Sequence, residues 1–319
     1  MTITKARATI PLPHWDDFLL SLQTNNYSPE TIYNYERDLQ VLAQFLHELK
    51  LSFTKLDKRT VDRYKAYLTS IDRRTSSQMI ATKRLKSYSI NRMLSSLRRY
   101  LKYLIEMDLP TPLPPEAVKL VKTEHKHPQV AELRELVQLI ECPLKFEKNQ
   151  PVALRNRAML EVLFSTGLRI SELTSLQRHQ IDGTGRMFIT GKGKKQRFVY
   201  LTPRAMKHVA TYLKTRADRR PALFIPYRGE NVGKRDARIS TNYLQMKIKQ
   251  YREQLGINVP TSAHSLRHGF ATYLAEQGAN PAAIQVLLGH ESLDTTTRYV
   301  HASDRYAETT HRKFHPLKQ

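Results

Sequence analysis

The sequence contains little of three things: cysteine, long apolar runs and acidic residues. Cys142 is the only cysteine of the 319-residue chain, which excludes a disulfide framework and a cysteine-based zinc site. No stretch approaches the roughly 20 apolar residues that a membrane-spanning helix needs, so we expect no membrane partner. Residues 1–15 also lack the apolar centre of a signal peptide. These absences together predict a protein of the reducing cytoplasm.

The shortage of acidic residues leaves the chain strongly basic. It has 29 Asp and Glu against 52 Lys and Arg, which gives a net charge of +23 and an isoelectric point near 10.1. Because this excess is spread along the chain and is not confined to a tail, we expect a polyanionic partner, with nucleic acid first. The alternative, a merely soluble basic protein, is less favoured. At 40% hydrophobic residues, the chain is rich enough to fold.

Apolar periodicity predicts two domains joined by a linker. Residues 1–108 are expected to form a helical domain, because apolar residues recur there at helical spacing. Residues 109–129 contain five prolines and no amphipathic period, which is typical of an extended linker. Residues 130–319 are expected to form a second, mainly helical domain. Helix-start and helix-stop signals fall at Ser28, Asp57, Ser262, Asn280, Gly278 and Gly289.

One segment of the second domain breaks the helical pattern. Residues 186–190 and 196–201 flank a turn rich in glycine and lysine at residues 191–195. Such a pattern predicts a β-hairpin. Its apolar side chains are Met187 and Ile189 on the first strand, then Phe198, Tyr200 and Leu201 on the second. The predicted fold class is therefore mainly α with a small β-hairpin.

Residues 263–302 concentrate side chains that suit phosphate chemistry. His264, Arg267 and His268 stand at i, i+3 and i+4, so they share one face of a helix, opposite an apolar face. A helical zinc motif would need a glutamate where Ser265 stands, and Arg267 would place a fixed cation beside the metal, so we expect no metal site. An anion clamp fits better, because a guanidinium is a rigid donor for phosphate oxygens.

Four segments resemble the tyrosine recombinase (phage integrase) family, and they occur in that family's order. They are RNRAMLEVLFSTGLRISEL, ITGKGKKQRFVYL, HSLRHGFATYLAEQGANPAAIQVLLGH and TTTRYVH. The first domain resembles the family's core-binding domain in size, helix pattern and position. The end of the chain resembles most the Xer branch and the small integrases and resolvases. The resemblance implies a two-domain architecture, a helical DNA-clamping domain followed by a mixed α/β catalytic domain.

The resemblance also implies a site-specific recombinase that cuts DNA through a tyrosine. Tyr299 would attack the phosphodiester and form a 3′-phosphotyrosyl link. Arg169 and Arg267 would bind the non-bridging oxygens, His264 would accept the tyrosine proton, and Lys192 would protonate the departing 5′-oxygen. These residue types can support that chemistry, because a phenol of pKa near 10 needs a base and nearby cations.

Three further residues have supporting roles in this interpretation. His290 would contact the phosphate or position the nucleophile, and Glu172 and His268 would orient their neighbours. No metal or nucleotide cofactor is needed. The implied partners are double-stranded DNA with specific recombination sites and three further copies of the chain, which form a tetramer on two duplexes and pass through a Holliday junction.

Basic residues of the first domain are candidates for contacts to the DNA backbone, although a charge run is often only a solvated face. They are Lys83, Arg84, Lys86, Arg92, Arg98 and Arg99. The segments 72–87 and 142–150 are longer than the compact Xer pattern requires.

Two other functions remain open at this stage. A DNA-binding regulator that no longer cleaves would have no use for a phenol beside two arginines. A type IB topoisomerase would use the same chemistry to relax DNA without exchanging partners. Taken singly, Tyr299, His290 and the Gly-Lys-Gly turn each have an ordinary structural explanation, and their joint order favours the recombinase.

Overall fold

The computed structural model describes residues 12–71, 73–75, 79–81, 83–123, 131–191, 196–230, 232–234 and 236–289. The chain divides into two compact units, Met1–His127 and Pro128–Gln319. The described parts are mainly helical, with one antiparallel two-stranded sheet, so the predicted fold class is confirmed. Lys192, His290 and Tyr299 lie outside the described residues.

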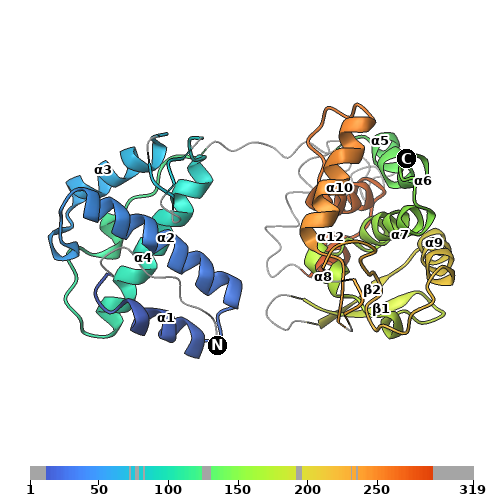
Figure 1. The fold of residues 1–319 in the computed structure, drawn as a ribbon, viewed down its shortest axis with the longest axis horizontal. Coiled ribbons are helices and arrows are strands. Elements are labelled where there is room, and N and C mark those ends of the chain that lie inside the picture. The colour runs from blue at the N-terminus through green and yellow to red at the C-terminus, as the bar shows by residue number, and fades with distance from the viewer. Residues whose placement is uncertain are drawn as a thin grey trace, which may run out of the picture. The chain divides into compact units, whose positions relative to one another are not determined.

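The N-terminal unit is built from amphipathic helices around one apolar core. Phe18, Tyr100 and Tyr103 form aromatic contacts in that core, with ring centroids 5.3 Å apart for each pair that includes Phe18. Helices α2 and α4 pack against each other (Figure 1). The elements are α1 (Trp15–Thr24), α2 (Pro29–Glu48), the 3₁₀ turn η1 (Phe53–Lys55), α3 (Lys58–Thr69), α4 (Ser87–Glu106) and the 3₁₀ turn η2 (Pro115–Ala117).

Two of its helix starts follow the predicted capping signals. The backbone N–H of Thr31 donates to Ser28 Oγ at 3.2 Å, and that of Thr60 donates to Asp57 Oδ1 at 2.7 Å. Each bond satisfies one of the backbone donors that a helix start leaves without a partner.

The proline-rich segment 109–129 differs from the expected linker over its first part. Leu113 and Val118 are buried in the core of the N-terminal unit. Val121 exchanges two hydrogen bonds with the Asn91 side chain of α4, at 2.9 and 2.8 Å. An asparagine side chain thus replaces the backbone partner that an extended segment lacks. Residues 109–121 therefore belong to the packed unit, which the absence of a helical period did not reveal.

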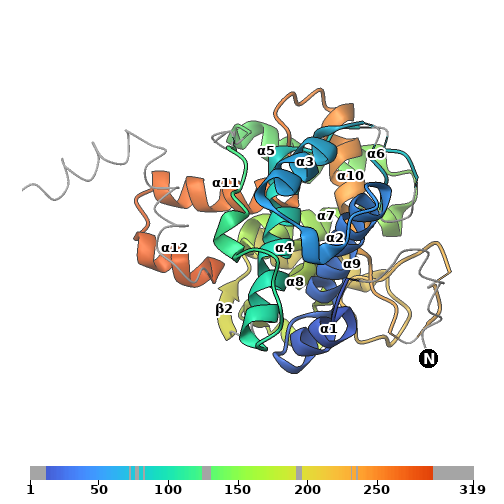
Figure 2. The same ribbon diagram turned by 90° about the vertical axis from the view of Figure 1, so that its left-hand side faces the viewer.

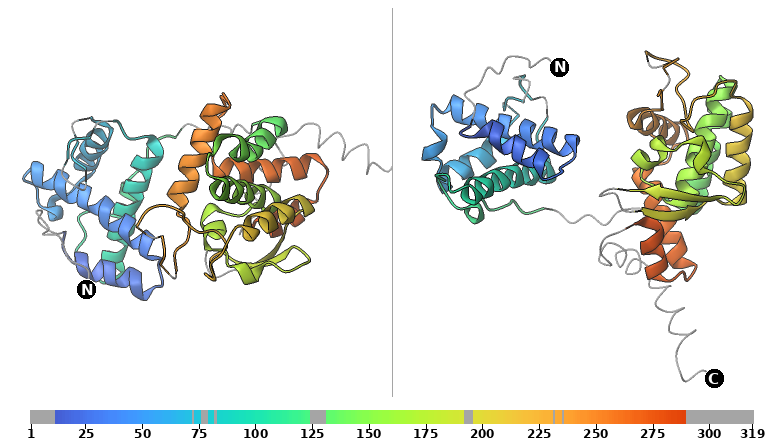
Figure 3. Two further views of the ribbon diagram at one scale, coloured as in Figure 1. Left: turned by 45° about the vertical axis from the view of Figure 1, so that its right-hand side comes forward. Right: turned by 90° about the horizontal axis from the view of Figure 1, so that it is seen from below.

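The C-terminal unit is organised around α7 (Gln150–Thr166), which is buried on nearly all sides. Helices α9 and α11 flank α7 (Figure 3). The remaining elements are α5 (Leu133–Glu141), α6 (Pro143–Phe146), α8 (Ile170–Ser175), η3 (Arg178–Gln180), β1 (Arg186–Thr190), β2 (Gln196–Tyr200), α9 (Pro203–Lys214), α10 (Thr241–Gln254), α11 (Ala263–Glu276) and α12 (Pro281–Leu288).

The predicted hairpin is present, and an arginine is among the core-facing residues of its second strand. Strands β1 and β2 pair antiparallel, with Phe188 opposite Phe198. Met187 and Ile189 face the core from β1, and Arg197 and Val199 face it from β2. Phe198 and Tyr200 are exposed. Successive side chains of a strand alternate between its faces, so the antiparallel register places an arginine in the core-facing row.

Helices α11 and α12 lie side by side at one edge of the unit (Figure 2). Ser262 Oγ accepts the Ser265 N–H at 3.2 Å, and Asn280 Oδ1 accepts the Ala282 N–H at 2.8 Å, so both predicted caps are confirmed. Gly289 ends α12 in the left-handed conformation, with φ of 64°. In the part of the chain that the structure describes, no helix combines the length and apolar character needed to cross a bilayer.

Candidate active site

Arg169 stands at the N-cap of α8, directly after the turn that ends α7. Its backbone N–H donates to Glu172 Oε2 and its guanidinium donates to Glu172 Oε1, both at 2.9 Å. The carboxylate therefore binds both ends of the same arginine and holds its side chain over the start of the helix. About a third of the Arg169 side chain stays exposed.

Glu172 has a second arginine partner that the sequence analysis did not single out. Arg197 of β2 donates through both terminal nitrogens, at 3.1 Å to Glu172 Oε1 and 2.7 Å to Oε2. Both side chains are almost fully buried. Burial alone would raise the pKa of Glu172, but hydrogen bonds from Arg197 and Arg169 outweigh it and leave that pKa below its usual value. Glu172 is thus held as a carboxylate.

Arg267 of α11 is buried, with 3% of the residue exposed, although its helix face was expected to be an open cationic one. Its two terminal nitrogens donate to backbone carbonyls, at 2.6 Å to Gly167 O and 2.7 Å to Leu288 O. A buried guanidinium needs such acceptors, and the turn after α7 and the end of α12 provide them. Arg267 therefore lies where α7, α11 and α12 meet.

Three arginines converge on the last carbonyls of α12. Arg197 Nε donates to Leu287 O at 2.8 Å, Arg267 donates to Leu288 O, and Arg169 donates to Gly289 O at 3.3 Å. The final carbonyls of a helix lack partners within it and carry a partial negative charge, so cations stabilise them. The three donors come from α8, β2 and α11, far apart in sequence.

Two glycines allow this close packing. A Cβ atom at Gly167 would lie 2.5 Å from Phe270 Cδ1 and 2.9 Å from Leu288 Cδ2, and a Cβ atom at Gly289 would lie 3.0 Å from Arg197 Cδ. Both glycines also have φ near +60°, which other residues rarely adopt. A side chain at Gly167 would clash with Phe270 and with Leu288 of α12, and a side chain at Gly289 would crowd Arg197.

His264 lies one turn before Arg267 and remains exposed. Partial desolvation, then the positive charges of Arg267 and Arg169, lower its pKa below the ordinary value of 6.5. His264 is therefore neutral at pH 7 and can accept a proton. The His268 ring packs edge-on to it, with centroids 6.4 Å apart, and burial also lowers the pKa of His268.

Of the residues predicted from the sequence, the structure brings Arg169, Glu172, Arg267 and His264 into one cluster. Gly289, at the centre of that cluster, immediately precedes His290, and β2 follows the turn that contains Lys192. Among the described residues, no group of three or more His, Cys, Asp or Glu side chains is placed to hold a metal ion.

The predicted DNA-contacting residues of the N-terminal unit differ in their exposure and in their partners. Lys83, Arg84 and Lys86 are exposed. Arg92 instead donates to the buried Asp38 at 2.6 Å, and Arg99 donates to Glu106 at 2.9 Å, while Arg98 is half-buried. Arg92 and Arg99 are thus each paired with a carboxylate inside the unit.

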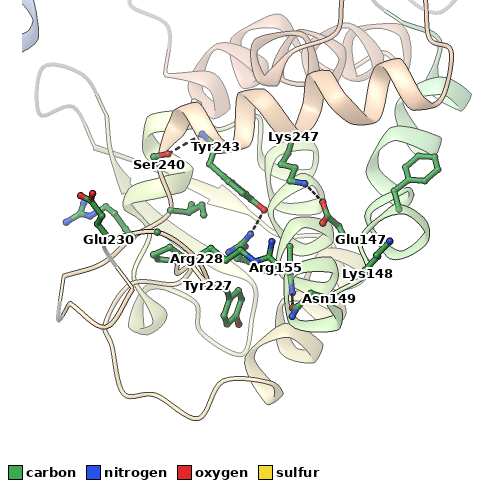
Figure 4. A pocket seen from close by; sticks show the side chains of 16 residues that line it. Glu147, Lys148, Asn149, Arg155, Tyr227, Arg228, Glu230, Ser240, Tyr243 and Lys247 are labelled. Atoms are coloured by element: carbon green, nitrogen blue, oxygen red, sulfur yellow. Dashed lines mark hydrogen bonds and ion pairs between the residues drawn. The ribbon is translucent and has the colours of Figure 1, made fainter.

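A second polar cluster of the C-terminal unit lines a cavity of about 550 Å³ (Figure 4). Arg155 lies within it, donating to Ile225 O at 2.8 Å and to Tyr243 Oη at 2.5 Å. The predicted long segment 142–150 supplies Glu147, which pairs with Lys247 at 2.7 Å. These bonds join α7, α10 and segment 142–150. No residue of the arginine cluster lines this cavity.

Comparison with known proteins identifies the family. Residues 130–305 match the model of the phage integrase family, and residues 15–107 match that of the phage integrase N-terminal SAM-like domain. Tyrosine recombinase XerC of Pelobacter propionicus is 35% identical over 308 residues, covering 94% of each chain. XerC of Lacticaseibacillus casei is 34% identical over 300 residues, covering 91% of this chain and 94% of its own.

Solved structures show the same fold. The XerH recombinase in a post-cleavage complex with a palindromic difH substrate aligns with a TM-score of 0.70 at 20% identity, covering 92% of this chain and 83% of its own. A lambda integrase dimer on a core site gives a TM-score of 0.68 at 14% identity, covering 91% and 95%. The chain therefore belongs to the phage integrase family. It is an enzyme of the tyrosine recombinase class, and its curated relatives described above are Xer recombinases.

Proposed function

We propose that this enzyme cuts and rejoins duplex DNA at specific sites, with Tyr299 as nucleophile and Arg169 and Arg267 as the cations that bind the reacting phosphate. The observation that carries this proposal is the convergence of both arginines, from α8 and α11, on the end of α12. Residues 290 and 299 follow that point in the sequence.

The arginine cluster suits a phosphodiester whose charge grows during the reaction. Arg169 uses two of its side-chain N–H groups in the bonds to Glu172 and Gly289, and its side chain is about one-third exposed. A guanidinium has five N–H groups, so others remain to bind phosphate oxygens. Fixed donors aimed at developing charge are usually the largest single contribution to catalysis. Glu172 keeps Arg169 in place for this purpose.

The proton transfers assign two further residues. As Tyr299 Oη forms its bond to phosphorus, its proton passes to His264, whose low pKa keeps it neutral at pH 7. As the bond from phosphorus to the 5′-oxygen breaks, Lys192 donates a proton to that oxygen. His290 contacts the phosphate or positions Tyr299. The products are a 3′-phosphotyrosyl link and a free 5′-hydroxyl, and no cofactor takes part.

Strand exchange follows because the phosphotyrosyl link preserves the energy of the phosphodiester. A 5′-hydroxyl from a second duplex reverses the reaction and creates a Holliday junction. Four active sites are needed for two duplexes, so we propose a homotetramer assembled on DNA in the cytoplasm. The exposed Lys83, Arg84 and Lys86 bind the DNA backbone from the N-terminal unit.

Trapping of the covalent intermediate tests this proposal. The recombination site is first selected from genomic fragments that bind the protein, and a nick is then placed beside the cleavage position so that the freed end diffuses away. Wild type should form a covalent protein–DNA adduct, and Tyr299→Phe should bind the same duplex without forming one. If no adduct forms on the selected site, the protein is instead a non-cleaving regulator.

Product analysis separates recombination from relaxation. Two duplexes that each contain the site should yield Holliday junctions and exchanged strands. Relaxation of supercoiled DNA with no exchanged strands would favour the type IB topoisomerase reaction.

A further inference from the structure

We propose that Arg197 is a positioning residue for strand cleavage, which fixes the end of α12 against α8 at the point that directly precedes His290 in the sequence. This inference rests on the proposed function above. Nothing in the family comparison assigns this role.

The contacts of Arg197 show that it acts inside the protein. All three of its guanidinium nitrogens donate to protein acceptors: Nε to Leu287 O, and the two terminal nitrogens to the Glu172 carboxylate. Its side chain is 6% exposed. Because all three of its nitrogens already have protein acceptors, Arg197 has little capacity left for a DNA phosphate. In contrast, Arg169 is about one-third exposed and binds protein acceptors through its two terminal nitrogens.

The hydrogen bonds of Arg197 connect three segments of the C-terminal unit. Arg197 belongs to β2, its carboxylate partner belongs to α8, and its carbonyl partner closes α12. Each of these segments lies within four residues of a proposed catalytic residue in the sequence: Lys192 before β2, Arg169 before α8 and His290 after α12. Arg197 therefore joins the three segments that stand close to these residues in the sequence.

We expect the hydrogen bond from Arg197 to Leu287 O of α12 to persist when DNA binds. Arg169 and Arg267 donate to the next two carbonyls of α12, and the same two guanidinium groups are proposed to bind the phosphate. Any shift of these arginines toward phosphate weakens their hold on α12. Arg197 takes no part in phosphate binding, so its bond to Leu287 O holds the helix end in both states.

Arg197→Lys changes the geometry while keeping a positive charge beside Glu172. A lysine has a single ammonium group and cannot bridge a carboxylate and a carbonyl as a planar fork does. Small displacements of reacting groups cost about 10²-fold in rate. We therefore expect Arg197→Lys to slow adduct formation about 10²-fold at saturating DNA, while the affinity for DNA changes less than about threefold.

Arg216→Lys is a matched control in the same unit. The Arg216 side chain is fully buried, binds Asp218 through two nitrogens at 2.9 and 2.5 Å, and donates to the carbonyls of Ala222 and Leu223. The substitution removes the same kind of fork at a carboxylate, and none of its bonds involves α8 or α12. It should lower the melting temperature about as much as Arg197→Lys and leave the cleavage rate unchanged.

Two measurements decide the matter. Without DNA, amide hydrogen exchange at residues 287–289 should be on the order of tenfold faster in Arg197→Lys than in wild type or Arg216→Lys. With a nicked substrate, only Arg197→Lys should show the rate loss. Arg197→Gln, which retains a planar amide but no charge, serves as the second variant if the lysine form does not fold.

The outcomes separate this inference from the proposed function. Unchanged exchange at residues 287–289, or equal rate losses in Arg197→Lys and Arg216→Lys, would overturn the positioning role. Absence of an adduct with wild type would overturn the proposed cleavage reaction instead, and the exchange measurement would still report whether Arg197 holds α12.

Discussion

The two units each contain a buried carboxylate bound by arginine, and the two carboxylates behave in opposite ways. In the N-terminal unit, Asp38 meets one partly exposed arginine, Arg92, and a hydroxyl from Ser96. Burial outweighs these partners and raises the pKa of Asp38 above its usual value. In the C-terminal unit, Glu172 meets two arginines and a backbone N–H, and its pKa is lowered.

Asp38 therefore makes a local contact, whereas Glu172 is an organising centre, which here means that it connects segments that are distant in the sequence. Burying a charge is costly, and only a full set of partners offsets the cost. The partners of Asp38 lie on one neighbouring helix, α4. Those of Glu172 come from α8 and β2, and through their other bonds they reach α12. The C-terminal unit thus uses its carboxylate to bring distant segments into one site.

Glu172→Gln should have the largest effect. It leaves two arginines without their buried counter-charge, which we expect to cost about 3–5 kcal/mol of unfolding free energy. Because the folded pKa is lowered, the contribution of this carboxylate is present above the ordinary value of 4.5 and is lost as the pH falls through the folded value. Denaturant unfolding monitored by circular dichroism at pH 7 measures the loss. A change below 1 kcal/mol would show that Glu172 is no organising centre.

Gly167→Ala should come next. The new methyl group would meet Phe270 at 2.5 Å, and the backbone has φ of +62°. Left-handed strain and overpacking together are expected to cost about 2–4 kcal/mol. Gly256→Ala is the matched control, with φ of +69° and open space around the Cβ position. Equal melting temperatures for the two variants would contradict the packing of α12 against this turn.

The pH dependence of cleavage tests whether His264, whose pKa the neighbouring arginines help to lower, is the base. Its pKa lies below 6.5, so kcat/KM for adduct formation should be level near pH 7 to 8. It should then fall about tenfold per pH unit once the pH drops below the His264 pKa, as the base becomes protonated. His264→Gln should lower the rate and remove this limb of the profile. A limb retained in that variant would assign the base elsewhere.

Asp38→Asn should have the smallest effect. The raised pKa means that the folded state disfavours the charged form of Asp38, so a neutral amide of similar shape should change stability by less than about 1 kcal/mol. The fluorescence of Trp15, which is the only tryptophan and is buried in this unit, monitors its unfolding. A loss above 3 kcal/mol would make the two carboxylates equivalent.

Local signals in the sequence predicted much of the fold. Ser262, Asn280 and Gly289 each act through neighbours within four residues, so their patterns were sufficient to place α11 and α12. Helical spacing and guanidinium chemistry indicated Arg267 as a phosphate ligand, and the resemblance added the catalytic roles of Arg169 and Arg267. It did not predict that Arg267 is buried, because that depends on the carbonyl of Gly167, 100 residues earlier.

Arg197 was missed for a similar reason. Its partners lie 25 and 90 residues away, so no local pattern connects them. One signal was available: in an alternating strand, an arginine in the same register as Val199 falls in the buried row. A charged residue there requires a buried counter-charge and points to one elsewhere in the chain. Phe198 and Tyr200 are aromatic and stand at alternate positions of the same strand, so the pattern drew attention to their row and away from Arg197 and Val199.

We propose that the C-terminal arginines set the rate of cleavage and that the N-terminal cations set the affinity for DNA. The most direct test measures the DNA dissociation constant and the single-turnover rate of adduct formation in parallel for Arg169→Ala and Arg84→Ala. We expect Arg169→Ala to lower the rate about 10²-fold or more with little change in affinity. For Arg84→Ala we expect weaker, more salt-sensitive binding with a normal rate at saturating DNA. If both substitutions changed the same quantity, this division of roles between the two sets of cations would be contradicted.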